Sequence, residues 1–80
     1  MNLDKDKLKS LKTQMEIAVI AVGRERKSQE FYLEASKSAL DEKSREMFII
    51  LADEEKKHLE KMEHLLENVK ALYEEEKKKK

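Results

Sequence analysis

The feature that most restricts the fold of this chain is its lack of residues that break helices. Its 80 residues include no proline and a single glycine, Gly23. A β-rich fold joins its strands with turns, and turns depend heavily on glycine and proline. An all-β fold is therefore close to excluded, and the sequence predicts an all-α protein. A chain of this length forms one domain, which we assign to residues 1–80.

Residues that can face a protein interior recur at alternating steps of three and four, which places them on one face of a helix. In the first half of the chain this stripe is made of Leu8, Leu11, Met15, Ala18, Val22, Glu25, Gln29, Tyr32, Ser36 and Ala39. In the second half it is made of Ser44, Phe48, Leu51, Glu55, His58, Met62, Leu65, Val69 and Leu72. We predict one helix over about 5–37, a turn over about 37–42 and a second helix over about 42–75, with Asp41 as the cap of the second helix.

A second apolar stripe lies beside the first on each predicted helix. Its members are Ile17, Ala21, Phe31 and Ala35 in the first half, and Ala52, Leu59, Leu66 and Tyr73 in the second. Two helices bury only one stripe each against one another, so the second stripes need further helices to cover them. We expect an antiparallel two-helix hairpin that dimerises, or forms a multiple of dimers, as a four-helix bundle.

Charge and composition exclude several classes of function. The 18 Lys and Arg residues balance the 18 Asp and Glu residues, so bulk charge favours neither nucleic acid nor an anionic membrane. The chain has no cysteine, which excludes disulfides, thiolate zinc sites and iron–sulfur clusters. The longest apolar run, 17–22, is far too short for a membrane span, and the first residues contain no apolar signal segment. We expect a cytoplasmic protein with no nucleic-acid or membrane partner.

Three polar residues, Glu25, Glu55 and His58, occupy positions on these stripes where leucine would pack better. Burying an unpaired carboxylate is costly, so their placement needs a reason. Glu55 and His58 lie three residues apart on one helical face and can reach the same metal ion. Glu25 and Glu55 each lie 15 residues from residue 40, the centre of the turn, and therefore at the same height, roughly 22 Å from it. Glu25, Glu55 and His58 are our candidate metal ligands and catalytic residues.

One chain supplies only three such ligands, whereas two chains supply four glutamates and two histidines. This is the ligand set of ferritin-like bundles that bind two iron or two manganese ions. The four carboxylates of a dimer would balance the charge of two divalent ions. The mixture of carboxylate and imidazole favours iron, two ions per dimer, with manganese as the alternative.

The residues around these ligands resemble the rubrerythrin-like branch of the ferritin-like di-iron superfamily. The stretch Glu25–Tyr32 reads ERKSQEFY, with a ligand glutamate seven residues before a tyrosine, and the stretch Phe48–His58 ends in Glu-x-x-His. The resemblance covers roughly residues 15–70. The short chain is more similar to half-length encapsulated ferritins, whose chains dimerise to complete the metal site.

The resemblance implies a non-haem di-iron protein that oxidises ferrous iron with dioxygen or peroxide, as a ferroxidase, in iron handling or in peroxide detoxification. Proteins of the encapsulated branch commonly end in a peptide that targets them to an encapsulin shell. The segment Glu74–Lys80 does not resemble such a peptide, so an encapsulin partner is not predicted from it.

The alternative function is that of a structural or interaction hairpin that associates with itself without metal. In that case Glu55 is one of many surface acids, Glu25 pairs with a lysine or arginine, and His58 is a hydrogen-bonded core histidine. Gly23 is expected to mark a close helix contact beside the site, because glycine weakens a helix interior.

Overall fold

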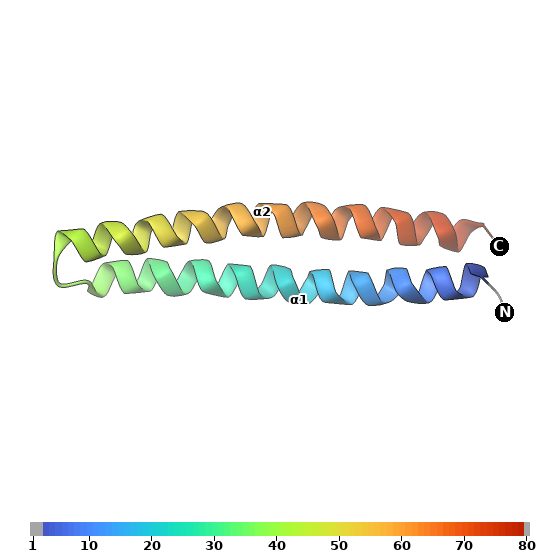
Figure 1. Ribbon diagram of the computed structural model, residues 1–80, viewed down its shortest axis with the longest axis horizontal. Helices are drawn as coiled ribbons and strands as arrows, with labels where there is room; N and C mark the ends of the chain where they lie inside the picture. The colour runs from blue at the N-terminus through green and yellow to red at the C-terminus, as the bar shows by residue number, and fades with distance from the viewer. Residues whose placement is uncertain (1–2, 80) are drawn as a thin grey trace.

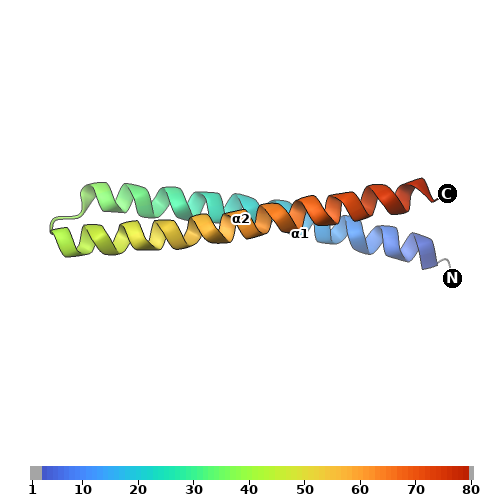
Figure 2. The same ribbon diagram turned by 90° about the horizontal axis from the view of Figure 1, so that it is seen from above.

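The chain folds as two long helices that run antiparallel (Figure 1). The computed structural model describes the backbone of residues 3–79 and the side chains of residues 6–79. Helix α1 spans Leu3–Ser38 and helix α2 spans Glu42–Lys78. The helices lie side by side along their whole length and cross at a shallow angle (Figure 2), so both termini lie at the end opposite the turn. The predicted all-α hairpin is confirmed.

The turn occupies residues 39–41, within the predicted range of about 37–42. Asp41 adopts an extended conformation, with φ −131° and ψ 158°, and its side chain accepts a hydrogen bond of 3.0 Å from the backbone N–H of Ser44. Hydrogen bonds from the side chain and backbone of Ser44 hold the pKa of Asp41 below its ordinary value. Asp41 is therefore the N-cap of α2, as expected from its sequence position. Helix α2 extends three residues beyond the predicted end at 75, through the basic residues of its last turn.

The contact between the helices follows the predicted stripe on α1. Its apolar members Leu11, Ala18 and Val22 are buried, at 0–9% exposed. On α2 the prediction is partly wrong. The apolar residues that α2 buries are Ala52 and Leu59 of the second stripe and Val69 of the first, so part of the second stripe faces α1.

Four residues of α2 that were predicted to face inward therefore lie at the edge of the contact and are exposed: Leu51, His58, Leu65 and Leu72. They recur every seven residues and thus share one line along the helix. These residues are exposed because α2 has two adjacent apolar stripes and only one helix to pack against. The periodicity cannot tell which of two such stripes a partner helix will cover.

The hairpin is a rod of 61 × 16 × 12 Å, and it buries little for its size. Its accessible surface is 6514 Å², whereas a compact monomer of 9.5 kDa would expose about 5,000 Å². Within the described part of the chain no large side chain is fully enclosed, and many apolar residues are about half exposed. Such a surface indicates association with another copy or with a partner. Neither described helix has a stretch apolar enough to cross a bilayer.

Gly23 lies on an exposed part of α1, and the expectation that it marks a close helix contact is wrong within the hairpin. A Cβ atom built there meets no neighbouring atom of the described structure within 4 Å. Glycine in a helix interior costs about 1 kcal/mol relative to alanine.

We therefore expect Gly23→Ala to raise the free energy of unfolding by about 1 kcal/mol, because it only increases helix propensity. Urea denaturation followed by circular dichroism measures this change. A loss of stability would show that another molecule approaches the backbone at this position.

The open end of the hairpin is held by a buried carboxylate. The side chain of Glu76 is only 5% exposed, and its Oε1 lies 2.9 Å from Lys7 Nζ on α1 and 2.9 Å from Lys79 Nζ. Hydrogen bonds from Lys7 and then from Lys79 lower the pKa of Glu76 below its ordinary value of 4.5. The charged carboxylate is thus stabilised in the folded state and joins the ends of the two helices.

We expect Glu76→Gln to lower the melting temperature at pH 7, since the amide cannot pair with two lysines. The pKa of Glu76 is lowered by folding, so its contribution is present above pH 4.5 and is lost as the pH falls through the folded-state pKa. The melting curves of the two proteins should therefore converge in acid. The exposed neighbour Glu75→Gln is the control and should melt like the native chain at every pH.

Candidate metal centre

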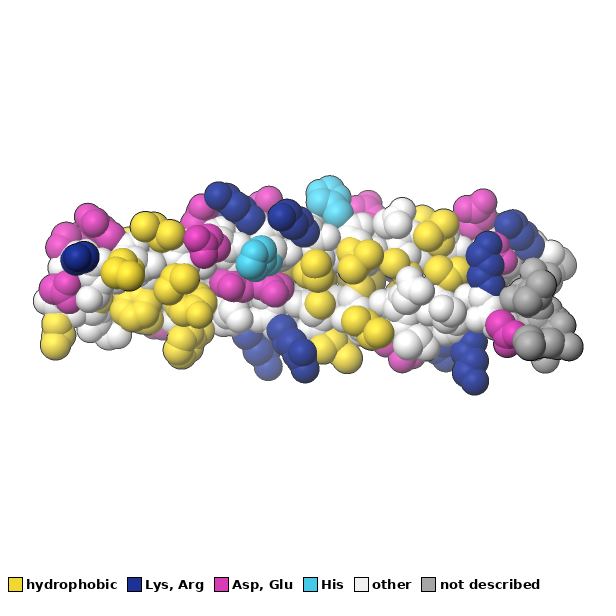
Figure 3. All heavy atoms as spheres, viewed as in Figure 1, with side chains coloured by type: hydrophobic (Ala, Val, Ile, Leu, Met, Phe, Trp, Pro, Cys, Tyr) yellow, Lys and Arg dark blue, Asp and Glu magenta, His cyan; other side chains and the backbone are white. Residues whose placement is uncertain are grey.

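The hairpin brings together all three residues of the predicted site. His58 Nδ1 lies 3.7 Å from Glu25 Oε2 and 3.8 Å from Glu55 Oε1. One ligand atom from each residue lies within 4.8 Å of the other two. Figure 3 shows a histidine beside two acidic side chains where the helices meet, with apolar side chains to either side. We call Glu25, Glu55 and His58 the acidic cluster.

Burial within the acidic cluster is uneven. The side chains of Glu25 and Glu55 are 27% and 22% exposed, whereas that of His58 is 54% exposed because it lies at the edge of the helix contact. The Oε2 atom of Glu25 is enclosed and has no hydrogen-bond partner among the described residues. An enclosed acceptor without a donor is uncommon in proteins and calls for an explanation such as an ion.

The two carboxylates also perturb one another. A side-chain hydrogen bond with Glu25, together with partial burial and the charge of Glu25, raises the pKa of Glu55 above its ordinary value of 4.5. His58 opposes this shift through its own charge when it is protonated. Two negative charges less than 4.8 Å apart repel one another unless a cation lies between or beside them.

Two of the three spacings in the acidic cluster, those from His58, are close to the spacing of ligand atoms around one small divalent ion. Bonds of about 2.1 Å to one ion place two ligand atoms roughly 3.0 Å apart at a right angle and roughly 3.6 Å apart at 120°. The distances of 3.7 and 3.8 Å from His58 Nδ1 are just above this range. A small rotation of the exposed imidazole would bring His58 within it.

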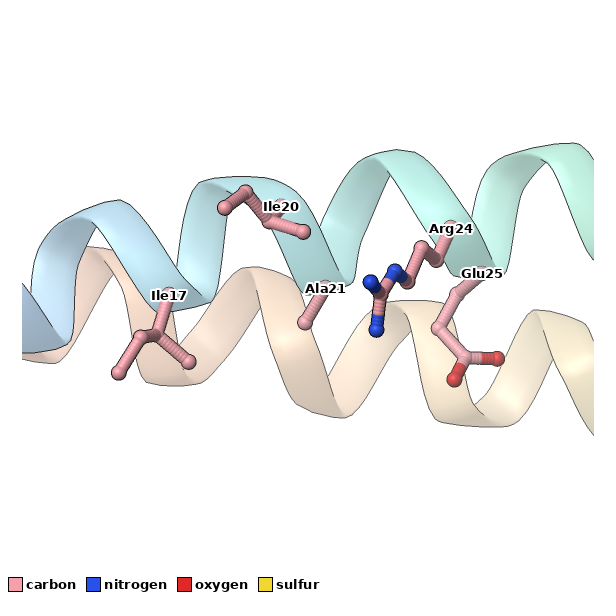
Figure 4. Close-up of a pocket in the computed structure, with 5 residues that line it drawn as sticks. All are labelled: Ile17, Ile20, Ala21, Arg24 and Glu25. Carbon is pink, nitrogen blue, oxygen red and sulfur yellow. The ribbon is translucent and has the colours of Figure 1, made fainter.

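An open cavity of about 370 Å³ adjoins the acidic cluster and is lined by residues of α1. Figure 4 shows its five lining residues, Ile17, Ile20, Ala21, Arg24 and Glu25. The side chains of Arg24 and Glu25 both project from α1 on the side of α2. The sequence analysis did not single out Arg24. It lies seven residues after Ile17 and seven before Phe31, so the three residues lie along the same face of α1.

Other polar residues near the helix contact stay outside the acidic cluster. Tyr32 packs its ring edge-to-face against Phe31, with centroids 5.4 Å apart, and its position is half-buried. His64 is exposed, as expected for a surface histidine, and is not part of the cluster. Among the described residues, the group of side chains that could hold a metal ion thus consists of the three that were predicted.

Comparison of the chain with models of protein families, with curated proteins and with solved structures finds no match in any of the three. The features of the chain that bear on its function are therefore the geometry of the acidic cluster and the surface around it.

We expect Glu55→Gln to raise the melting temperature of the metal-free protein at pH 7. The amide removes the repulsion from Glu25 and can donate a hydrogen bond to its enclosed Oε2. Because folding raises the pKa of Glu55, the native chain should lose stability as the pH rises from 4.5 through the folded-state pKa. The variant should lack that loss in thermal melts recorded with a chelator. A variant that melts below the native chain at pH 7 would contradict the repulsion.

Proposed function

We propose that this protein binds iron through Glu25, Glu55 and His58, two ions per dimer, and acts as a non-haem di-iron ferroxidase. The observation that supports this most directly is the enclosed Oε2 of Glu25, an acceptor without a donor, within 4.8 Å of ligand atoms from Glu55 and His58. A cation satisfies that oxygen and cancels the repulsion between the carboxylates. Carboxylate oxygen and imidazole nitrogen are ligands that iron and manganese accept.

A second copy of the chain would complete the site, because three ligands leave a metal ion under-coordinated. The second copy would bind to the side of the hairpin on which His58 lies. We call this surface the apolar flank, and its exposed apolar residues are Ile17, Phe31, Met47, Leu51, Leu65 and Leu72. On α2, Leu51, Leu65 and Leu72 lie at intervals of seven residues from His58 and therefore along the same face of the helix. On α1, Ile17 lines the cavity beside Glu25.

The opposite side of the hairpin has charged side chains at the helix contact. There Arg26 and Glu63 form an ion pair of 3.6 Å across the helices, and Glu67 and Lys70 line the same depression. Packing two apolar flanks together would give a four-helix bundle with both acidic clusters inside. This dimer accounts for the excess surface of the single hairpin.

In this proposal the two glutamates and the histidine of each chain hold the metal ion, and the two carboxylates balance its positive charge. Bound ferrous iron would supply the electrons that reduce dioxygen or peroxide. The apolar flank would keep bulk water from the centre, since it surrounds the cluster with aliphatic and aromatic side chains. The resemblance to rubrerythrin-like and encapsulated ferritin proteins agrees with this assignment.

A second candidate function is an interaction hairpin that associates without metal. The observation in its favour is the apolar flank itself, which would drive association whether or not the acidic cluster binds an ion. Metal content separates the two candidates.

We expect the native protein to take up about one ferrous ion per chain under anaerobic conditions. Glu55→Ala and His58→Ala should abolish this uptake while retaining the helical circular dichroism signal. Metal analysis after gel filtration gives the stoichiometry. Added ion should also raise the melting temperature of the native chain alone, because only the folded site binds it.

The chain provides matched controls for both changes. Glu54→Ala removes a neighbouring acid and His64→Ala removes the other histidine, and neither residue belongs to the acidic cluster. Both controls should bind iron like the native protein. Equal uptake by all four variants would exclude the proposed ligands.

A further inference from the structure

We propose that the cavity beside Glu25 is the path by which dioxygen reaches the iron of the proposed function. The proposal rests on the metal and the dimer of that function, and it names dioxygen as the oxidant. Three features of the cavity support it: the direction in which it runs along α1, its aliphatic walls, and an unpaired cation beside Glu25.

A single alanine accounts for the cavity. Side chains four residues apart form ridges on the surface of a helix. Ile17, Ala21 and Glu25 form one such ridge of α1, and Ile20 and Arg24 belong to the next. The short side chain of Ala21 lies between two longer neighbours and interrupts the first ridge (Figure 4). We attribute the cavity of about 370 Å³ to this gap.

The same ridge gives the cavity its direction. Each step of four residues advances about 40° around a helix and about 6 Å along it. From Ile17 to Glu25 the ridge therefore turns by about 80°, toward the contact with α2. Ile17 is 59% exposed, whereas the side chain of Glu25 is 27% exposed and belongs to the acidic cluster. The cavity thus leads from the surface of α1 to the candidate metal ligands.

The walls of the cavity favour an apolar gas over a hydrated ion. Three of the five lining residues, Ile17, Ile20 and Ala21, are aliphatic. Cavities with aliphatic walls stay free of water and take up apolar gases such as xenon. Dioxygen is small and apolar, whereas a ferrous ion would lose favourable hydration on passing these side chains.

Arg24 adds a charge that distinguishes the oxidant from the metal. It is exposed and lines the cavity beside Glu25, and among the described residues its guanidinium has no ion-pair or hydrogen-bond partner. Its positive charge is therefore not compensated within the hairpin. An uncompensated cation repels ferrous ions from the cavity but leaves neutral dioxygen unaffected.

The second copy would turn the open cavity into a channel. Ile17 belongs to the apolar flank, which the second copy covers in the proposed dimer. Ile20 lies about 60° around α1 from Ile17, on the side away from Glu25, and also lines a separate hollow with Val19. Ile20 therefore stands outside the flank, and the channel would open to solvent beside Ile20 and end at Glu25.

Methyl NMR of the native protein in EDTA under xenon pressure tests the path without iron, because xenon is an apolar gas that can take the place of dioxygen. We expect the methyl signals of Ile17 and Ala21 to shift as the xenon pressure rises. Ile20→Trp places a large ring at the outer opening and should abolish these shifts. Val19→Trp is the matched control, since Val19 lines only the separate hollow, and it should retain them.

The rate of iron oxidation then connects the path with the oxidant. Each protein is loaded with ferrous iron under anaerobic conditions and mixed with dioxygen in a stopped-flow instrument. Ile20→Trp should take up as much iron as the native chain but oxidise it about tenfold more slowly, because access becomes rate-limiting. Val19→Trp should oxidise its iron at the native rate.

Two results would overturn the proposal: methyl signals of the native protein that xenon does not shift, or equal rates of oxidation by dioxygen in Ile20→Trp and the native chain. The second result would overturn it even if Ile20→Trp slowed oxidation by hydrogen peroxide, because the path would then serve a polar oxidant. A native chain that takes up no iron would instead contradict the proposed function. The xenon shifts, measured without iron, would still decide whether the cavity admits an apolar gas.

Discussion

The two carboxylates of Glu25 and Glu55 occupy the space between two helices that apolar side chains would otherwise fill, and much of the structure depends on how their charge is balanced. Within one chain the balance is incomplete: the pKa of Glu55 is raised, one oxygen of Glu25 is enclosed without a donor, and the only nearby imidazole is half exposed. At the open end the opposite holds, since Glu76 is more deeply buried than either of them but is matched by two lysines. The contrast shows that this chain can pair a buried acid fully within one hairpin.

The sequence predicted the hairpin well because its strongest signals are local. The absence of proline, the three-and-four spacing of apolar residues and the cap at Asp41 each act over a few residues. The three members of the acidic cluster followed from simple geometry, because residues equally far from a tight turn lie opposite one another in an antiparallel pair.

What the sequence did not predict depends on contacts between helices. Periodicity placed His58 inside the helix contact, whereas the structure places it at the edge, because Ala52 and Leu59 make the contact instead. Ala52 is buried and Leu51 is exposed, and no rule of spacing ranks Ala52 above Leu51. The orientation of Arg24 beside the cluster was missed for the same reason: it follows from the rotation of the helices about their axes.

The placement of contacts along the hairpin also sets an order in which they can form. His58 meets Glu25 across 33 residues of chain, and Glu76 meets Lys7 across 69. The entropy lost on closing a loop grows only with the logarithm of its length, so this doubling costs about 0.6 kcal/mol. Once the Asp41 turn has formed, the helices can pair progressively toward their ends, with the acidic cluster assembled before the lysine contacts of Glu76. Thermal opening should run in reverse, so backbone amides near the chain ends would exchange with solvent while those around Glu25 and Glu55 remain protected.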